Sequence, residues 1–189
     1  SHWTFDEGDQ IVCLDSAPTG FHGFKHGFES APGVAGDGFL CRGGAVSVGN
    51  DPLFFPDEGI TVELWANPSK PDQSDQWFVN TVAASDTGYR LGLGGGKVAW
   101  QVPVTDWSHM VGAPEPLPVG RWSHVVATYD NETMRIYVNG EEQASLPRPG
   151  RIRVSTGNLV LGSFQPGHAR AYFEGVMDEV RLYDRALTA

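Results

Sequence analysis

Positive charge is scarce in this sequence. Its 189 residues include 13 lysines and arginines against 23 aspartates and glutamates, for a formal net charge of −10. A surface that binds nucleic acid needs clustered Lys and Arg, so this balance argues against a nucleic-acid partner. It also disfavours non-specific attraction to anionic membranes, whereas neutral glycans and divalent cations are compatible with an acidic surface.

Long apolar runs, helical periodicity and cysteine are scarce as well. No run of 18 apolar residues occurs, so we expect no membrane span. No window of about 12 residues keeps the 3.6-residue period of an amphipathic helix, so we expect almost no helix. Cys13 and Cys41 allow one disulfide, but two cysteines do not decide between a bridge and a free buried pair.

Turn residues and short apolar stretches are abundant instead. The 24 glycines and 13 prolines are spread along the chain and separate about a dozen segments with strand character. Asn139-Gly140 is the clearest turn signal, since this dipeptide favours a type I′ hairpin. The pattern predicts an all-β fold of two antiparallel sheets packed face to face, a sandwich or jelly roll. The length fits one domain over residues 1–189, and the abrupt start suggests a domain excised from a larger protein.

One carboxylate interrupts the last predicted strand, residues 176–183. Alternation places Asp178 on the same face as Val176, Val180 and Leu182, a row that should point into the core. A buried carboxylate needs a partner, because desolvating its charge is costly. The partner is a cation, a set of backbone N–H donors, or a buried arginine.

Several blocks of the sequence together resemble one family, the LamG-like jelly-roll domains of the concanavalin A-like lectin/glucanase superfamily. The blocks are Trp3-x-Phe5-Asp6-Glu7-Gly8, Asp15-Ser16, Gly43-Gly44-Ala45-Val46, Ile60 to Trp65, Gly120 to Val125 with Tyr129-Asp130, Ile136 to Gly140, and Gly175 to Tyr183 with Ala186-Leu187. The resemblance is nearly end to end. It implies a concanavalin A-like fold and leaves the ligand open, since such folds host many activities.

The resemblance also implies a structural Ca2+ ion. Asp178 would supply a carboxylate, helped by oxygens near Asp6 and from the loop before Ala45, where residues 36–42 depart from the family pattern. Such a set suits Ca2+, which takes six to eight oxygen ligands. The alternative is that N–H groups or an arginine hold Asp178.

Catalytic carboxylates are missing from the expected arrangement. Glucanases of this superfamily carry Glu-x-Asp-x-Glu along one strand, which places three acids on one face. This sequence has no such triplet, and Glu63 is an isolated acid beside Trp65. We therefore expect no enzyme activity.

Trp107 is the strongest candidate for sugar stacking. Exposed rings stack on the C–H faces of sugars, and polar neighbours read the hydroxyl groups. Trp107 lies in a proline-rich loop with His109, where a core role is least expected, whereas Trp65 and Trp122 match core positions of the family.

A second part of the predicted glycan site lies on one hairpin. Trp100 and Tyr89 occupy its facing strands and would extend the platform, with Arg90 and Gln101 as hydroxyl readers. The alternative is that these rings fill the mouth of the sandwich.

Taken together, these features predict a non-catalytic carbohydrate-binding module of an extracellular, secreted or cell-surface protein, with a polysaccharide or glycan as its partner. The first alternative is an adhesion module of the laminin G type that binds a protein ligand. The second is an enzyme with a divergent acid pair.

Overall fold

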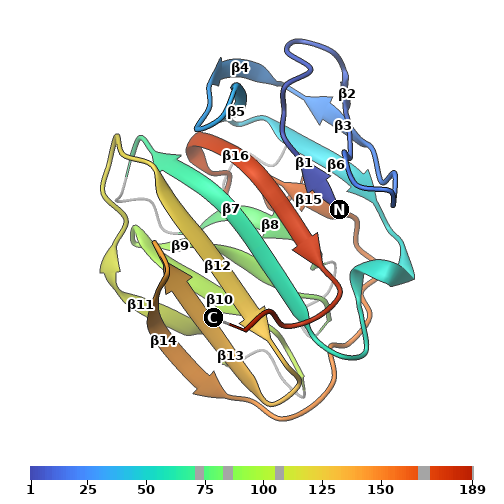
Figure 1. Cartoon of the computed structure of the whole chain (residues 1–189), viewed down its shortest axis with the longest axis vertical. Helices are drawn as coiled ribbons and strands as arrows, with labels where there is room; N and C mark the ends of the chain where they lie inside the picture. The colour runs from blue at the N-terminus through green and yellow to red at the C-terminus, as the bar shows by residue number, and fades with distance from the viewer. Residues whose placement is uncertain (71–74, 83–86, 105–108, 166–170, 189) are drawn as a thin grey trace.

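The computed structural model describes residues 1–70, 75–82, 87–104, 109–165 and 171–188, which form two antiparallel sheets packed face to face (Figure 1). This confirms the predicted all-β sandwich. Within the described ranges the helix is limited to one short 3-10 turn, Pro52–Phe54. No described helix has the length and apolar character that a membrane crossing requires.

Sheet A lies in front in Figure 1 and has eight strands. Seven follow one another across the sheet, and the eighth, β1, pairs with β16. In spatial order they are β14 (Glu141–Pro147), β13 (Thr133–Val138), β12 (Ser123–Tyr129), β7 (Ile60–Pro68), β16 (Glu174–Tyr183), β5 (Asp37–Arg42) and β4 (Glu29–Pro32), with β1 (His2–Trp3) beside β16. The last strand therefore pairs with the first.

Sheet B lies behind sheet A and also has eight strands. In spatial order they are β11 (Val111–Pro116), β10 (Lys97–Gln101), β9 (Arg90–Gly94), β8 (Gln76–Asn80), β15 (Leu159–Leu161), β6 (Ala45–Gly49), β3 (Gly23–His26) and β2 (Val12–Cys13).

Two hairpins form where turn residues predict them. Asn139 and Gly140 have φ values of 53° and 83° between β13 and β14, the left-handed pair that a type I′ turn requires. Gly95 and Gly96 make the equivalent turn between β9 and β10, with φ values of 58° and 79°.

The core lies between the two sheets. In β7 the inward residues Val62 and Leu64 are completely buried, whereas Glu63 between them is half-buried on the outer face. Burying one such aliphatic side chain contributes about 1.5–3 kcal/mol to stability. Cys13 and Cys41 are both buried in this core and are not bonded to each other.

The predicted alternation of β16 is wrong in its first half. Met177 is completely buried, whereas Val176 is half-buried. The pairing of β16 with β7 shifts register just after Asp178, and Glu179 at this shift has a φ of 53°. Such a bulge reverses which residues point inward, so Val180 also reaches the core. Asp178 is therefore buried at the bulge itself and is not one of a regular inward row.

Candidate functional site

A row of side chains crosses the outer face of sheet B. Residues directly opposite each other on paired strands share a face. Strand registers join six positions in this way, namely Gln101, Arg90, Asn80, Val160, Ser47 and Phe24. Phe24 is 60% exposed and Val160 lies outside the core cluster, which places the row on the outer surface of the sandwich.

Arg90 and Gln101 lie side by side in this row. Arg90 Nε donates a hydrogen bond to Gln101 Oε1 at 2.7 Å. The Arg90 guanidinium also lies over the Trp77 ring, 4.1 Å from its centroid, a cation–π geometry. The Trp77 ring in turn lies over Gly92, where an added Cβ would come within 2.7 Å of the ring. The structure thus brings together the two predicted hydroxyl readers and supports them with a ring that the sequence prediction did not include.

Tyr89 and Trp100 do not extend this platform, which corrects the sequence prediction. Both side chains are completely buried, with ring centroids 5.8 Å apart in the core. Neighbouring residues on a strand point to opposite faces, so outward Arg90 and Gln101 require inward Tyr89 and Trp100. Trp100 Nε1 donates to the Thr128 carbonyl at 3.2 Å. The alternative prediction, that these rings fill the sandwich, therefore holds.

A pocket of about 200 Å³ opens beside Asn80 in the same row. Its lining residues are Asn80, Val82, Gly157, Asn158, Val160, Phe164 and Gln165. Asn80 is 1% exposed, and its Nδ2 donates to the Phe164 carbonyl at 2.9 Å, which fixes the orientation of the amide. Asn80 Oδ1 is buried with no hydrogen-bond partner within the described part of the chain. A buried acceptor without a hydrogen bond lowers the stability of the fold by about 1–3 kcal/mol. A ligand in the pocket that donates a hydrogen bond to Asn80 Oδ1 would remove this cost.

Trp107 and His109 are the two remaining predicted ligand residues. Trp107 lies outside the described residues. His109 is exposed and precedes β11. The observed ring that lines the pocket with the amides is Phe164.

Asp178 is held by backbone N–H groups. Its Oδ2 accepts hydrogen bonds from Val34 N at 2.8 Å and Ala35 N at 3.0 Å, and its Oδ1 accepts one from Glu179 N at 2.7 Å. Burial raises the pKa of the Asp178 carboxyl above its ordinary value, although these N–H bonds act in the opposite direction. N–H donors, one of the three predicted kinds of partner, are thus present.

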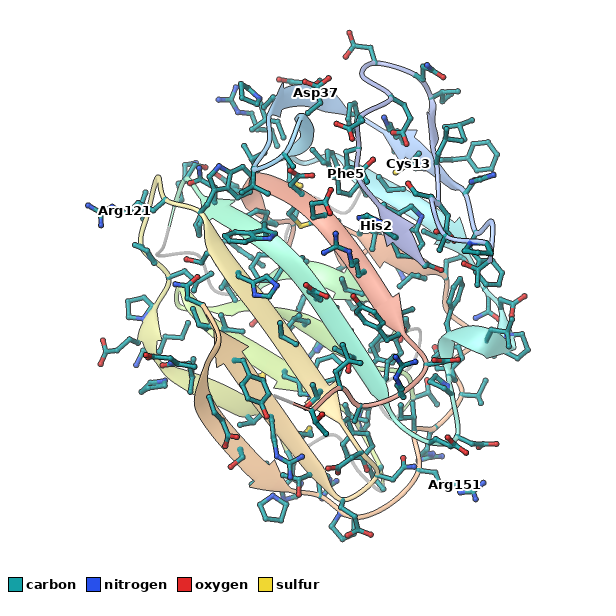
Figure 2. The ribbon with its side chains drawn as sticks, viewed as in Figure 1. His2, Phe5, Cys13, Asp37, Arg121 and Arg151 are labelled. Carbon is teal, nitrogen blue, oxygen red and sulfur yellow. The ribbon has the colours of Figure 1, made fainter. Side chains whose placement is uncertain are left out.

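Asp6 contacts the same loop, residues 33–37. Its Oδ1 accepts a hydrogen bond from Asp37 N at 2.9 Å. Figure 2 shows Asp37 and Phe5, the neighbour of Asp6, at the same end of the sandwich. Phe5 has a φ of 63°, so a left-handed residue adjoins Asp6 just as Glu179 adjoins Asp178. Left-handed non-glycine residues are strained and persist where the surroundings hold them.

These residues fit Ca2+ as part of a coordination sphere. Asp178 Oδ1 accepts a single hydrogen bond, and Asp6 Oδ2 accepts none within the described residues. Carboxylate oxygens with free lone pairs are the hard ligands that Ca2+ takes. The described residues contain no group of three or more Asp, Glu, His or Cys side chains arranged to hold a metal ion, so the other ligands would be backbone carbonyls or water.

Glu63 is the centre of a polar network on the outer face of sheet A, and not the isolated acid that the sequence indicates. His124 Nε2 donates to its Oε1 at 2.9 Å, and the Tyr183 hydroxyl donates to its Oε2 at 2.7 Å. Arg181 adds a contact of 3.4 Å to Oε1. The hydrogen bond from His124 above all lowers the pKa of Glu63, to about 2, despite partial burial. A carboxyl that stays ionised at neutral pH cannot act there as a general acid.

Trp65 lies on this same outer face, which corrects its prediction as a core residue. It is half-buried, and its ring centroid is 5.1 Å from that of His124. The alternation of β7 points Trp65 and Glu63 outward together, opposite to Leu64.

Sequence reasoning missed Asn80, Trp77 and Phe164. Asn80 sits in a strand whose five residues are all buried, and an amide within an otherwise apolar run is a signal that could have drawn attention to it. Trp77 is one of six tryptophans in the sequence, and only the folded structure shows that its ring supports Arg90.

Comparison with known proteins gives a consistent result. The family model described as the concanavalin A-like lectin/glucanases superfamily, a laminin G model, matches residues 42–189. No curated protein sequence matches the chain. Many solved structures do.

Three of these structures illustrate the range. Domain 4 of AbnA, a GH43 extracellular arabinanase from Geobacillus stearothermophilus in complex with arabinotriose, is 21% identical with a TM-score of 0.72, covering 100% of this chain and 93% of that chain. The CBM40 of the Ruminococcus gnavus IT-sialidase, bound to α2,3 sialyllactose, is 18% identical with a TM-score of 0.57, covering 70% of this chain and 79% of that one. The botulinum neurotoxin serotype G binding domain is 12% identical with a TM-score of 0.72, covering 99% of this chain and 48% of that one.

At these identities the structural likeness establishes the fold and no more. The family model, in contrast, spans well over half of the sequence. The chain therefore belongs to the concanavalin A-like lectin/glucanase superfamily, as a domain of the laminin G type.

Proposed function

We propose that this chain is a non-catalytic, extracellular carbohydrate-binding module whose glycan lies on the outer face of sheet B. The observation that carries the proposal is Asn80 Oδ1, a buried acceptor without a partner in the described residues, in the wall of a pocket of about 200 Å³. Sugar hydroxyls are donors of the kind this oxygen lacks. Asn158 and Gln165 add two further amides to the pocket, and Phe164 adds a ring that can face sugar C–H groups.

The row of polar side chains beyond the pocket is long enough to contact an oligosaccharide of more than one sugar unit. Arg90 is the direct cross-strand partner of Asn80, and Gln101 is the partner of Arg90. Polar groups therefore continue from the pocket across β9 and β10. Two of the structural neighbours were solved with oligosaccharides, which supports the same class of ligand here.

Two features support a non-catalytic role. The sequence has no Glu-x-Asp-x-Glu triplet. Glu63, the acid with several polar neighbours, has a pKa lowered to about 2, far from the range that suits a general acid at neutral pH.

We also propose that Ca2+ binds beside Asp178 and Asp6 and ties the chain ends together. Both carboxylates accept hydrogen bonds from backbone N–H groups of loop 33–37, and each adjoins a residue with left-handed φ. The ion would add a charge partner to the buried Asp178 carboxylate, and its role would be structural.

A glycan array that includes plant and bacterial polysaccharides tests the binding proposal. We expect at least one neutral or charged glycan to bind, and Gln165→Ala and Asn80→Ala to weaken that binding about tenfold or more. Gln165 is exposed, so its variant should keep the native melting temperature even if Asn80→Ala lowers it. Gln143→Ala, an amide on β14 of the other sheet, is the matched control.

The same experiment tests the predicted role of Trp107 through Trp107→Ala. Binding of no glycan at all, or binding unchanged in both pocket variants, contradicts the proposal. Recovery of a protein ligand that resists glycosidase treatment would favour an adhesion module instead. Glycan cleavage that is lost in Glu63→Gln would favour an enzyme.

A further inference from the structure

A second recess lies at one end of the sandwich, apart from the Asn80 pocket. Its volume is about 470 Å³, within the range of about 300–1,000 Å³ that is typical of small-molecule sites. Its lining residues are Arg42, Ser69, Lys70, Tyr172 and Glu174. All five carry polar side chains, which sets this recess apart from the largely apolar sites that bind hydrophobic ligands.

The topology of sheet A assembles the charged part of the recess. Arg42 ends β5 and Glu174 begins β16, and the two are direct cross-strand partners. Lys70 follows β7, the strand on the other side of β16, and Ser69 N donates to the Glu174 carbonyl at 2.9 Å. Three neighbouring strands therefore present Arg42, Glu174 and Lys70 side by side at one end.

The charges of the recess do not cancel. Lys70 Nζ lies 2.7 Å from Glu174 Oε2, so these two groups neutralise each other. The Arg42 side chain is exposed and makes no hydrogen bond or ion pair within the described ranges of the chain. One positive charge is thus left over, on a protein whose net charge is −10. An unpaired guanidinium presents a planar fork of donors that matches an oxyanion such as a carboxylate.

The recess adjoins sheet B through Tyr172. Tyr172 pairs with Trp77 of β8 and with Ser163 in isolated bridges, and Trp77 is the ring that supports Arg90 in the outer row. Glu174 N also donates to Gln76 Oε1 at 2.9 Å, which links β16 to the start of β8. A polysaccharide on the outer face of sheet B can therefore reach the recess along β8.

We propose that this recess is a subsite for the anionic group of an acidic glycan, with Arg42 as its principal contact. The Lys70 ammonium and the Ser69 and Tyr172 hydroxyls supply further donors around the same oxyanion. The group is a carboxylate, as in a uronic acid, or a sulfate ester. This inference rests on the proposed carbohydrate-binding function and narrows its ligand to acidic polysaccharides.

Pairs of polymers that differ only in charge provide the test. For the carboxylate arm, binding of polygalacturonate is compared with that of fully methyl-esterified pectin. For the sulfate arm, dextran sulfate is compared with dextran. Isothermal titration calorimetry is run with the whole chain, with Arg42→Gln and Arg42→Lys, and with Arg151→Gln as a control. Arg151 is an exposed arginine that lies 3.3 Å from Asp57, just before β7, whereas Lys70 follows the other end of that strand (Figure 2). Its loss therefore changes the net charge equally at a distance from the recess.

We expect the native chain to prefer the charged polymer of at least one pair by tenfold or more. Arg42→Gln should remove that preference, Arg42→Lys should retain part of it, and Arg151→Gln should leave it within twofold. Because Arg42 is exposed, melting curves of the variants should match that of the native chain.

Equal binding of charged and uncharged polymers, or equal losses in Arg42→Gln and Arg151→Gln, would overturn this inference and leave the carbohydrate-binding proposal standing. If no glycan binds, neutral or charged, both this inference and the carbohydrate-binding proposal are overturned.

Discussion

His124 Nε2 donates a hydrogen bond of 2.9 Å to Glu63 Oε1 across the β12–β7 pair. Glu63 also accepts from Tyr183 and Arg181, so one carboxylate joins three strands of sheet A on its outer face. Hydrogen bonds to an ionised acceptor are stronger than those between neutral groups. The strength of the network therefore depends on the ionisation of Glu63, and so it depends on pH.

Acid should weaken this network in a defined window. The pKa of Glu63 is lowered from 4.5 in the unfolded chain to about 2 in the fold, chiefly by the hydrogen bond from His124. A lowered pKa stabilises the fold above the unfolded value, and this contribution is lost as the pH falls from 4.5 towards 2. Glu63→Gln should lower the melting temperature at pH 7 by about 2–4 °C, the shift for about 1 kcal/mol in a chain of this size. It should also flatten the acid dependence in that window.

Thermal melts between pH 2 and pH 7 check this expectation. Glu115→Gln, an exposed acid on β11, is the control and should keep the native pH profile. A Glu63→Gln profile that runs parallel to the native one throughout would contradict the assigned role.

The buried hydroxyl of Tyr89 should destabilise the fold. Its ring packs against Trp100 and Phe55, but the hydroxyl is buried with no partner in the described chain. Burial also raises the pKa of Tyr89 well above its ordinary value. Because an unpaired buried polar group costs about 1–3 kcal/mol, Tyr89→Phe should raise the free energy of unfolding by about 1 kcal/mol.

Tyr129→Phe is the matched comparison. Tyr129 is equally buried, but its hydroxyl donates to the Arg148 carbonyl at 2.7 Å. Its removal leaves that carbonyl short of a donor, so we expect a loss of about 1 kcal/mol. Urea unfolding measures both variants, and a destabilised Tyr89→Phe would show that an unseen partner serves the hydroxyl.

Gly92 should be essential to the geometry of the outer face of sheet B. An added Cβ would come within 2.0 Å of the Gln76 carbonyl and 2.7 Å of the Trp77 ring. Gly92→Ala must therefore displace Trp77 and, with it, the Arg90 side chain. We expect a loss of about 1–3 kcal/mol in stability, as for other overpacking substitutions, together with weaker glycan binding.

Gly94→Ala tests whether this effect is local. Gly94 lies on the same face of β9, and an added Cβ would have no neighbour within 4 Å. Its variant should stay close to the native chain in near-ultraviolet circular dichroism, whereas Gly92→Ala should change the aromatic signal. Identical behaviour of the two variants would count against the packing of Trp77 on Gly92.

The sequence pattern was sufficient to predict the parts of the fold that depend on local chemistry. Asn139-Gly140 predicted its hairpin because only such residues accept two left-handed positions cheaply. Alternation failed in β16, because the bulge after Asp178 depends on pairing with β7, which no local pattern encodes.

The candidate site was predictable only in part, for a related reason. Arg90 and Gln101 were identified from their hairpin, but alternation already implied that Tyr89 and Trp100 beside them face the other way. Asn80 becomes a direct neighbour of Arg90 only through the register of β8 with β9. Cross-strand register is a long-range property, so the pocket could not be read from the chain alone.

Chelation should lower the stability of the fold if Ca2+ binds beside Asp178. An ion present at about 100 times its dissociation constant stabilises the native state by about 2.7 kcal/mol. For a chain of this size that corresponds to a fall of about 5–10 °C in melting temperature on addition of EDTA. Re-addition of Ca2+ should restore the native melt, and Mg2+ should not, since Mg2+ demands a tighter octahedral shell.

Variants of the two carboxylates separate the metal from the N–H groups that already hold Asp178. Asp178→Asn should be insensitive to EDTA, because a neutral amide is a far weaker ligand for a hard cation. Asp6→Asn should reduce the EDTA response, and Asp184→Asn, an exposed acid beyond β16, should keep it in full. An unchanged native melt on chelation would mean that Val34, Ala35 and Glu179 alone hold this carboxylate through their N–H groups. The left-handed residues beside Asp6 and Asp178 would then be held by the surrounding protein and not by an ion.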